Sequence, residues 1–141
     1  MFKKILLPID VEHSGSWDKA LPMAMQIADE GGEIHLLGIV HDLGSAMIAS
    51  FLPDGAEKKA MEKLKHALQT FAETNAPASG HVEVHVAHGH VPEAILRTAE
   101  NLGADLIVIA SHPPDDLTSR LVGSNAGKVV HHSPRPVLVV R

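Results

Sequence analysis

The sequence predicts an α/β fold in which an open parallel sheet carries helices on both faces. Apolar segments of strand length alternate with amphipathic segments of helical period along the whole chain, which is the pattern of βαβ units with right-handed crossovers. One segment, Ala104–Ala110, is almost wholly apolar, as expected of a central parallel strand covered on both faces. The 141 residues contain no repeat, low-complexity tract or linker, so we expect one domain, residues 1–141.

Five segments are predicted to be strands. The third alternates strictly, with valines on one face and His81, Glu83 and His85 on the other, so we expect it at a sheet edge with one wet face. In chain order, the predicted strands are Phe2–Ile9, Glu33–Val40, His81–Ala87, Ala104–Ala110 and Pro136–Val140.

Four segments between these strands have helical period. Candidate N-caps, a capping box of Asp54 with Glu57, and a proline near the first turn mark where the first three begin. The expected starts are Ser14 or Ser16, Asp54, Val91 and about Ser124, and the first and last helices are expected to end at Gly31-Gly32 and at His132.

Composition excludes several classes of function. The net charge is −5, Lys and Arg are scattered, and aromatic residues make up 3% of the chain, so the sequence offers neither a basic stripe nor a stacking surface for nucleic acid. The absence of cysteine excludes disulfides and thiolate metal sites and fits a reducing compartment. Because no apolar run approaches the length of a membrane span and no signal pattern opens the chain, we expect a cytoplasmic protein without membrane insertion.

The segment from Ile107 to Val140 has the pattern of an anion site. An apolar strand runs into a polar loop that ends at Gly123-Ser124-Asn125, and a short helix follows. A helix that begins at a small, glycine-led turn presents unpaired N–H groups and the positive end of its dipole to an anion such as phosphate. We therefore predict that Gly123, Ser124 and Asn125 hold a nucleotide phosphate.

Four stretches of the chain resemble the universal stress protein family, and in particular its small single-domain members. They are KKILLPID, HLLGIV, HVAHGHVPEAILRTAENLGADLIVIASH and LVGSNAGKVVHHSPRPVLVVR, and the resemblance covers essentially the whole chain. The specific part is the spacing from Ser111-His112 to Gly123-Ser124 and on to the terminal PVLVV. The resemblance implies a strand order of 3-2-1-4-5 and a Rossmann-like fold of the adenine nucleotide alpha hydrolase type.

The resemblance also implies a site for ATP, or for AMP or ADP, where the strand order reverses. Asp10 would accept a hydrogen bond from the ribose or help to hold Mg²⁺ or Mn²⁺ bridging the phosphates. Pro8, Ile9 and Ile39 would form an apolar slot for adenine, and Gly89 would let its loop pass close by. The other expected binding residues on this site are Ile109, Ala110, Ser111 and His112.

The chain departs from the glycine pattern of the nucleotide-binding family members. That pattern is a glycine, two residues, a second glycine, nine residues, and a glycine followed by Ser or Thr, and the positions here are Ala110, Pro113, Gly123 and Ser124. Pro113 lacks an N–H that would otherwise bond a phosphate oxygen. The S-H-x-P form with an intact G-S-N resembles one sub-branch whose members bind ATP, whereas loss of the glycines favours a nucleotide-free dimeric interaction protein.

The leading hypothesis is a cytoplasmic, ATP-binding stress-response protein whose bound nucleotide alters the surface offered to a protein partner. The sequence shows no pairing of a nucleophile with a base, so no catalytic residue is assigned and any hydrolysis should be slow. An adenine-nucleotide enzyme is an alternative that rests on fold analogy alone. Related proteins pair the terminal strand with its copy, which implies a homodimer through the edge strand Pro136–Val140.

Eleven histidines are many for a chain of this length, and His81, His85, His88 and His90 fall close together. Transition-metal binding would require three or four convergent ligands. The favoured interpretation is a solvated face whose charge rises as the pH falls through the imidazole range.

Overall fold

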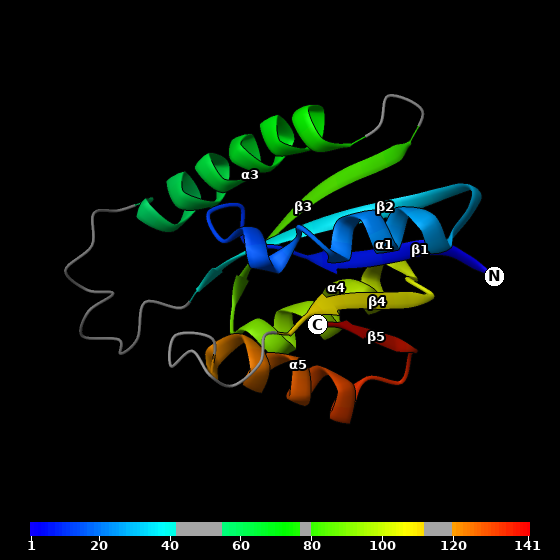
Figure 1. Cartoon of the computed structure of the whole chain (residues 1–141). Helices are drawn as coiled ribbons and strands as arrows, with labels where there is room; N and C mark the ends of the chain where they lie inside the picture. The colour runs from blue at the N-terminus through cyan, green and yellow to red at the C-terminus, as the bar shows by residue number, and fades with distance from the viewer. Residues whose placement is uncertain (42–54, 77–79, 112–119) are drawn as a thin grey trace.

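The computed structural model describes residues 1–41, 55–76, 80–111 and 120–141. Five parallel strands form one sheet in the order β3-β2-β1-β4-β5, which confirms the predicted sheet and its order (Figure 1). The third strand is an edge strand, as its alternation predicts. The strands are β1 (Phe2–Pro8), β2 (Ala28–His41), β3 (His81–Gly89), β4 (Leu106–Ala110) and β5 (Val137–Val140).

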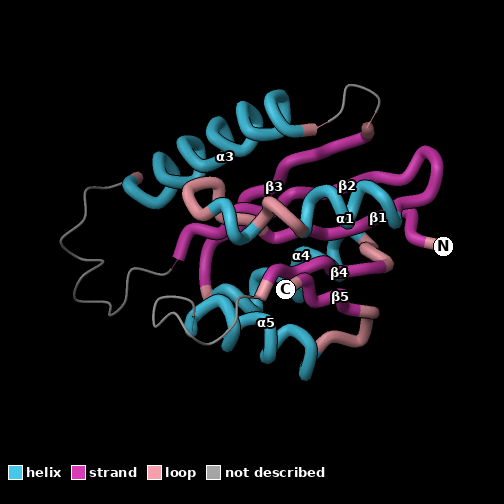
Figure 2. Tube along the Cα trace, viewed as in Figure 1, coloured by secondary structure: helices cyan, strands magenta, loops and turns pink. Residues whose placement is uncertain are grey.

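Helices cover both faces of the sheet (Figures 1 and 2). One face packs against α1 (Ala20–Ile27) and α3 (Ala56–Asn75), and the other against α4 (Val91–Leu102) and α5 (Arg120–His132). Successive side chains of a strand point to opposite faces, so Ile5 and Leu7 of β1 join the first core and Leu6 joins the second. No helix in the described ranges is both long and apolar enough to cross a membrane.

The first α-helix is shorter than predicted, and β2 is correspondingly longer. The chain leaves α1 at Ala28, whose ψ of 139° is extended, rather than at Gly31. Gly31, with a φ of +78°, then bends the chain, and the register between β1 and β2 shifts before Lys4 pairs with Glu33. Ala28 packs against the first core from the strand, so its helical spacing in the sequence was misleading.

The predicted capping box at the start of α3 is wrong. The N-cap residue is Gly55, with a φ of +81°, and no side chain caps the helix; Asp54 lies outside the described residues. Glu57 instead has its Oε1 3.3 Å from Nδ1 of His88, at the carboxyl end of β3. Gly55 can adopt its left-handed conformation without the steric cost that a side chain would bring.

Candidate functional site

The strand order reverses between β1 and β4, which are neighbours at the centre of the sheet. Helix α1, which follows β1, lies on one face of the sheet, whereas α5, which follows β4, lies on the other (Figure 1). In open α/β sheets, ligands bind outside the carboxyl ends of the strands at such a point. The segments Pro8–Asp10 and Ala110–Ser111 occupy this position.

Asp10 is held in a tight turn immediately after β1. Its N–H donates to Oγ of Ser16 at 2.8 Å, and the same hydroxyl donates back to the Asp10 carbonyl at 2.8 Å. Oδ1 of Asp10 accepts the N–H of Glu12 at 3.0 Å, and Oδ2 lies 2.7 Å from Nδ1 of His13. The Asp10 side chain is still 56% exposed, and a carboxylate with two such contacts retains acceptor capacity for a ligand.

The predicted adenine slot is divided between the two faces of the sheet. Ile9 packs into the α1/α3 core, and its N–H donates to the carbonyl of Leu37 at 2.9 Å. Pro8 and Ile39 are half-buried, and Ile39 packs on the α4/α5 side, where the alternation of β1 also places Pro8. Ile9 is therefore a core residue, and Pro8 and Ile39 are the members of the slot that solvent still reaches.

The residues at the end of β4 are almost fully buried. Ile109 belongs to the α4/α5 core and Ala110 to the α1/α3 core. The N–H of Ser111 donates to the carbonyl of Val140 at 2.8 Å, so β5 already occupies this donor. His112 lies outside the described residues.

Gly89 ends β3 at the same edge of the sheet, with a φ of +126° that side chains rarely adopt. Among the described residues, and apart from its two chain neighbours, no atom lies within 4 Å of the point where a Cβ would stand. A side chain is therefore disfavoured by the backbone conformation and not by crowding from the described residues.

The helix that carries Gly123, Ser124 and Asn125 begins earlier than predicted. Within the described residues, α5 is already helical at Arg120. The three residues therefore lie inside the helix, where the N–H groups of Ser124 and Asn125 bond to carbonyls four residues before them. A glycine in a helix costs only about 1 kcal/mol relative to alanine. Gly123 is therefore tolerated inside α5 and does not determine where the helix begins.

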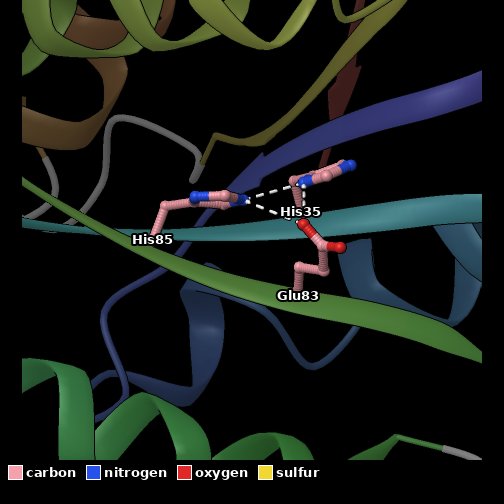
Figure 3. Close-up of side chains that lie close together, drawn as sticks. All are labelled: His35, Glu83 and His85. Carbon is pink, nitrogen blue, oxygen red and sulfur yellow. Dashed lines mark hydrogen bonds and ion pairs between the residues drawn. The ribbon is translucent and has the colours of Figure 1, made fainter.

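A second group of polar side chains lies on the α4/α5 face of β2 and β3. The apolar cluster on this face includes Leu37 and Ala87, and toward the amino ends of the two strands polar residues replace it. His35 pairs in register with Glu83, and Nδ1 of His35 lies 2.8 Å from Nε2 of His85 and 3.5 Å from Oε2 of Glu83 (Figure 3). His35 is only 3% exposed.

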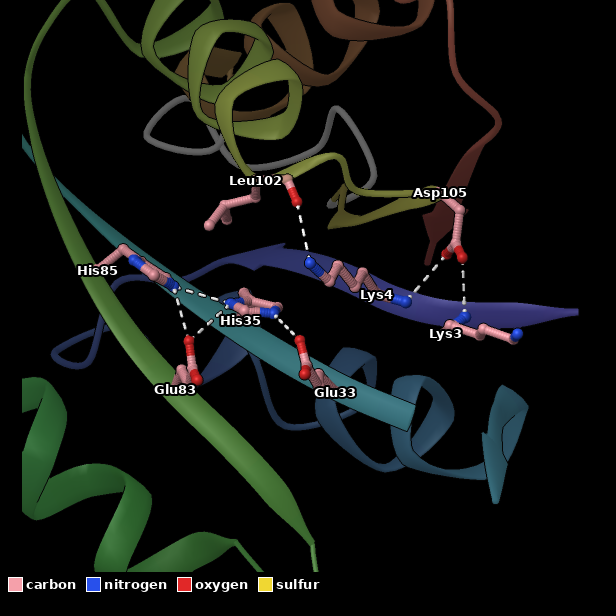
Figure 4. Close-up of polar contacts among 8 residues, drawn as sticks. All are labelled: Lys3, Lys4, Glu33, His35, Glu83, His85, Leu102 and Asp105. Atoms are coloured by element: carbon pink, nitrogen blue, oxygen red, sulfur yellow. Dashed lines mark hydrogen bonds and ion pairs between the residues drawn. The ribbon is translucent and has the colours of Figure 1, made fainter. Parts of the chain in front are cut away.

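Glu33 extends this group on the far side of the His35 ring. Its Oε2 lies 2.9 Å from Nε2 of His35, and this hydrogen bond is the main reason that the pKa of Glu33 is lowered. Burial lowers the pKa of His85, and the charge of His35 adds to this effect while Glu83 opposes it. The nearby Lys4 ammonium donates to the carbonyl of Leu102 at 3.4 Å (Figure 4).

His35 was not predicted as a site residue. The sequence pattern indicated a different grouping of the histidines. It correctly placed His81 and His85 on one face of β3 but grouped His85 with His88, which instead lies near Glu57. The available signal was a single ionisable residue inside the apolar strand HLLGIV, beside a neighbouring strand that carries two more on one face. The prediction of a solvated face is correct for His81, which is exposed. It is wrong for His85, which stacks on the buried ring of His35.

Comparison with known proteins identifies the family. The family model described as the universal stress protein family matches residues 1–141. The chain belongs to the universal stress protein family. It is 35% identical over 143 residues to universal stress protein G of Shigella flexneri and 36% identical over 148 residues to universal stress protein G of Salmonella typhimurium, in each case with 100% of both chains covered.

Solved universal stress protein structures share this fold. The structure of protein MJ0577 of Methanocaldococcus jannaschii has a TM-score of 0.76 at 26% identity, with 99% of this chain and 96% of that chain covered. A universal stress protein solved in complex with cAMP has a TM-score of 0.69 at 21% identity, with 99% and 97% covered.

Proposed function

We propose that this universal stress protein binds ATP, or another adenine nucleotide, at the reversal between β1 and β4. One observation carries the proposal: the exposed carboxylate of Asp10 stands at the carboxyl end of β1, next to the point where the strand order reverses. A family member of the same fold was solved with cAMP, so this fold can accommodate an adenine nucleotide.

The expected contacts follow from chemistry and position. Adenine lies against Pro8 and Ile39, the ribose hydroxyls donate to Asp10, and Gly89 leaves room at the neighbouring strand end. The phosphates lie toward the N-terminal part of α5, whose dipole favours anions and which carries Gly123 and Ser124. Because these residues lie within the helix, the Ser124 hydroxyl and the missing side chain of Gly123, more than their N–H groups, are expected to matter.

The residues present fit a hard divalent cation bound together with the nucleotide. Asp10 offers a carboxylate oxygen, the ligand type that Mg²⁺ and Mn²⁺ prefer, and Mg²⁺ is typically held by one or two carboxylates plus substrate phosphates. When bound, such an ion would neutralise phosphate charge near the Asp10 turn.

The proposed role is regulatory binding with at most slow hydrolysis. The nucleotide would change the surface that a cytoplasmic protein partner meets, and residues 1–141 would act as one domain. We further propose a homodimer through β5, because this edge strand carries the half-buried residues Val137, Leu138 and Val139 and one side that no strand of the described residues pairs with, which a second copy would satisfy.

The test is nucleotide content and affinity. The purified protein is denatured and the supernatant analysed for adenine nucleotide, and Mg·ATP binding is then measured by calorimetry for the wild type, Asp10→Ala and Gly123→Val. We expect both variants to bind at least about tenfold more weakly, because Asp10→Ala loses a charge-assisted hydrogen bond and Gly123→Val adds a side chain where the phosphates would lie.

Asp18→Ala is the matched control, because it removes an exposed carboxylate from the same connection without touching the Asp10 turn. The control should keep the wild-type affinity. A blank in the wild type at millimolar ATP with magnesium would reject nucleotide binding and favour the nucleotide-free interaction protein.

A further inference from the structure

We propose that His35, Glu83 and His85 form a binding site for a divalent transition-metal ion of the Zn²⁺ type, with a fourth position open to water. The site lies on the α4/α5 face of β2 and β3 and is independent of the nucleotide site. Each residue offers one ligand atom, and all three atoms lie within 4.8 Å of one another (Figure 3).

The three ligand atoms have the spacing of a metal site. Nδ1 of His35 lies 2.8 Å from Nε2 of His85, and Oε2 of Glu83 lies 3.5 Å and 3.8 Å from these two nitrogens. A triangle with these sides has one point about 2.0 Å from every corner, within the Zn–N and Zn–O range of about 2.0–2.2 Å. At that point the ion lies in the plane of the three atoms, so the two nitrogens must move apart for the ion to take a tetrahedral position outside this plane.

The hydrogen bonds of His35 leave the correct nitrogen free for a metal. The Glu33 carboxylate accepts a hydrogen bond, so its contact with Nε2 fixes the proton of a neutral His35 on that nitrogen. Nδ1 then carries a lone pair that points to His85. A carboxylate on the second nitrogen of a ligating imidazole is the usual partner in metal sites, because it orients the ring and raises its basicity.

The contact between the two rings is itself suited to replacement by a cation. Two imidazole nitrogens 2.8 Å apart need a proton between them, and in the present arrangement the proton belongs to His85. A metal ion takes the place of that proton, and His85 moves its own proton to Nδ1.

The exposure of the three ligands indicates how an ion reaches the site, and their types indicate which ion binds. His35 is 3% exposed and held by Glu33, whereas the side chains of His85 and Glu83 are 27% and 61% exposed, so an ion can enter from the β3 side. Two imidazoles and one carboxylate favour Zn²⁺ and its neighbours over Mg²⁺ or Ca²⁺, which prefer oxygen ligands. Three protein ligands leave one position of a tetrahedron for water.

The test is metal binding by the full chain without a polyhistidine tag. After treatment with EDTA, Zn²⁺ is titrated against a chromophoric chelator, and Co²⁺ is titrated separately while its visible d–d absorption is recorded. We expect one ion per chain and the intense absorption of four- or five-coordinate Co²⁺. His85→Gln and Glu83→Gln should each bind at least about 100-fold more weakly, beyond the about 10–100-fold that Glu33→Gln should cost.

His81→Gln is the matched control, because it removes an exposed imidazole from the same strand and face. This variant should bind Zn²⁺ as the wild type does. The site is refuted if His85→Gln and Glu83→Gln bind like the wild type, if His81→Gln weakens binding equally, or if the wild type binds no ion. His35→Gln is interpreted only if its far-UV circular dichroism is native, and the two more exposed ligands otherwise decide.

Discussion

The imidazole rings of His35 and His85 stack across two neighbouring parallel strands, with centroids 5.0 Å apart and planes inclined by 27°. Their facing nitrogens lie 2.8 Å apart, so two positive charges on this pair would repel strongly. Protonation of His85 is therefore coupled to folding as well as to metal binding. The consequence is measurable in the free energy of unfolding.

His85 is predicted to make stability fall on mild acidification. Burial lowers the pKa of His85 from its ordinary value of 6.5, so the unfolded chain takes up a proton at a pH where the folded chain still resists it. Stability is then lost as the pH falls from about 7 through the folded-state pKa. Between about pH 7.5 and 5.5, in buffer with EDTA, the wild type should lose more unfolding free energy than His85→Gln.

Urea unfolding at several pH values measures this difference. His81→Gln is the comparison that tests whether any histidine on this face has the same effect, since His81 is exposed on the same strand. Parallel pH profiles for the wild type and His85→Gln would contradict the account.

Gly38 of β2 is predicted to be required for the close packing of α3. An added Cβ would stand 2.7 Å from Cδ1 of Leu68, a fully buried side chain, and 3.0 Å from Cδ2 of Leu64. Gly38→Ala should therefore destabilise the fold by about 1–3 kcal/mol through overpacking. Chemical denaturation measures the change, and a variant as stable as the wild type would be inconsistent with this packing.

Gly127→Ala is the matched glycine control for that measurement. Gly127 lies in α5, and no described atom outside its own helical backbone stands within 4 Å of the position that its Cβ would take. Since alanine favours the helix over glycine, this variant should be more stable by about 0.5–1 kcal/mol.

The proposed dimer predicts a specific sensitivity of β5 to charge. Val139→Lys places an ammonium on the edge strand and should convert the dimer to a monomer, as measured by light scattering after size exclusion. Val130→Lys, on the half-exposed surface of α5, should remain dimeric. A monomeric wild type, or a dimeric Val139→Lys with native circular dichroism, would reject the β5 interface.

Hydrophobic period was sufficient to predict the five strands and the four α-helices of the described residues, and the family resemblance gave the strand order. The predicted helix boundaries were less accurate where they rested on a glycine. Gly31 bends a strand that has already begun, and Gly123 lies inside its helix. These glycines mark local conformations that tertiary packing, not propensity, decides. The alternation of residues along a strand also shows which side chains share a face. It does not show which side chains of two neighbouring strands are in contact.

In the candidate sites too, some residues could be predicted from the sequence and others could not. Asp10 was predictable because a carboxylate directly after a central parallel strand lies where ligands bind. Ile9 was assigned to the ligand and is a core residue, since position along a strand does not reveal which face is covered. His35 was missed because its partners, Glu83 and His85, are set by the register between β2 and β3, which the sequence does not display.

Backbone amide NMR of ¹⁵N-labelled protein during titration with Mg·ATP tests the central claim most directly. The account predicts shifts at Asp10, Gly89 and Gly123, which lie at the carboxyl ends of the strands or on α5. It predicts none at Gly31 and Gly103, which lie toward the opposite, amino ends of the strands. A spectrum unchanged at millimolar nucleotide, or shifts confined to the opposite edge, would contradict nucleotide binding at the reversal between β1 and β4.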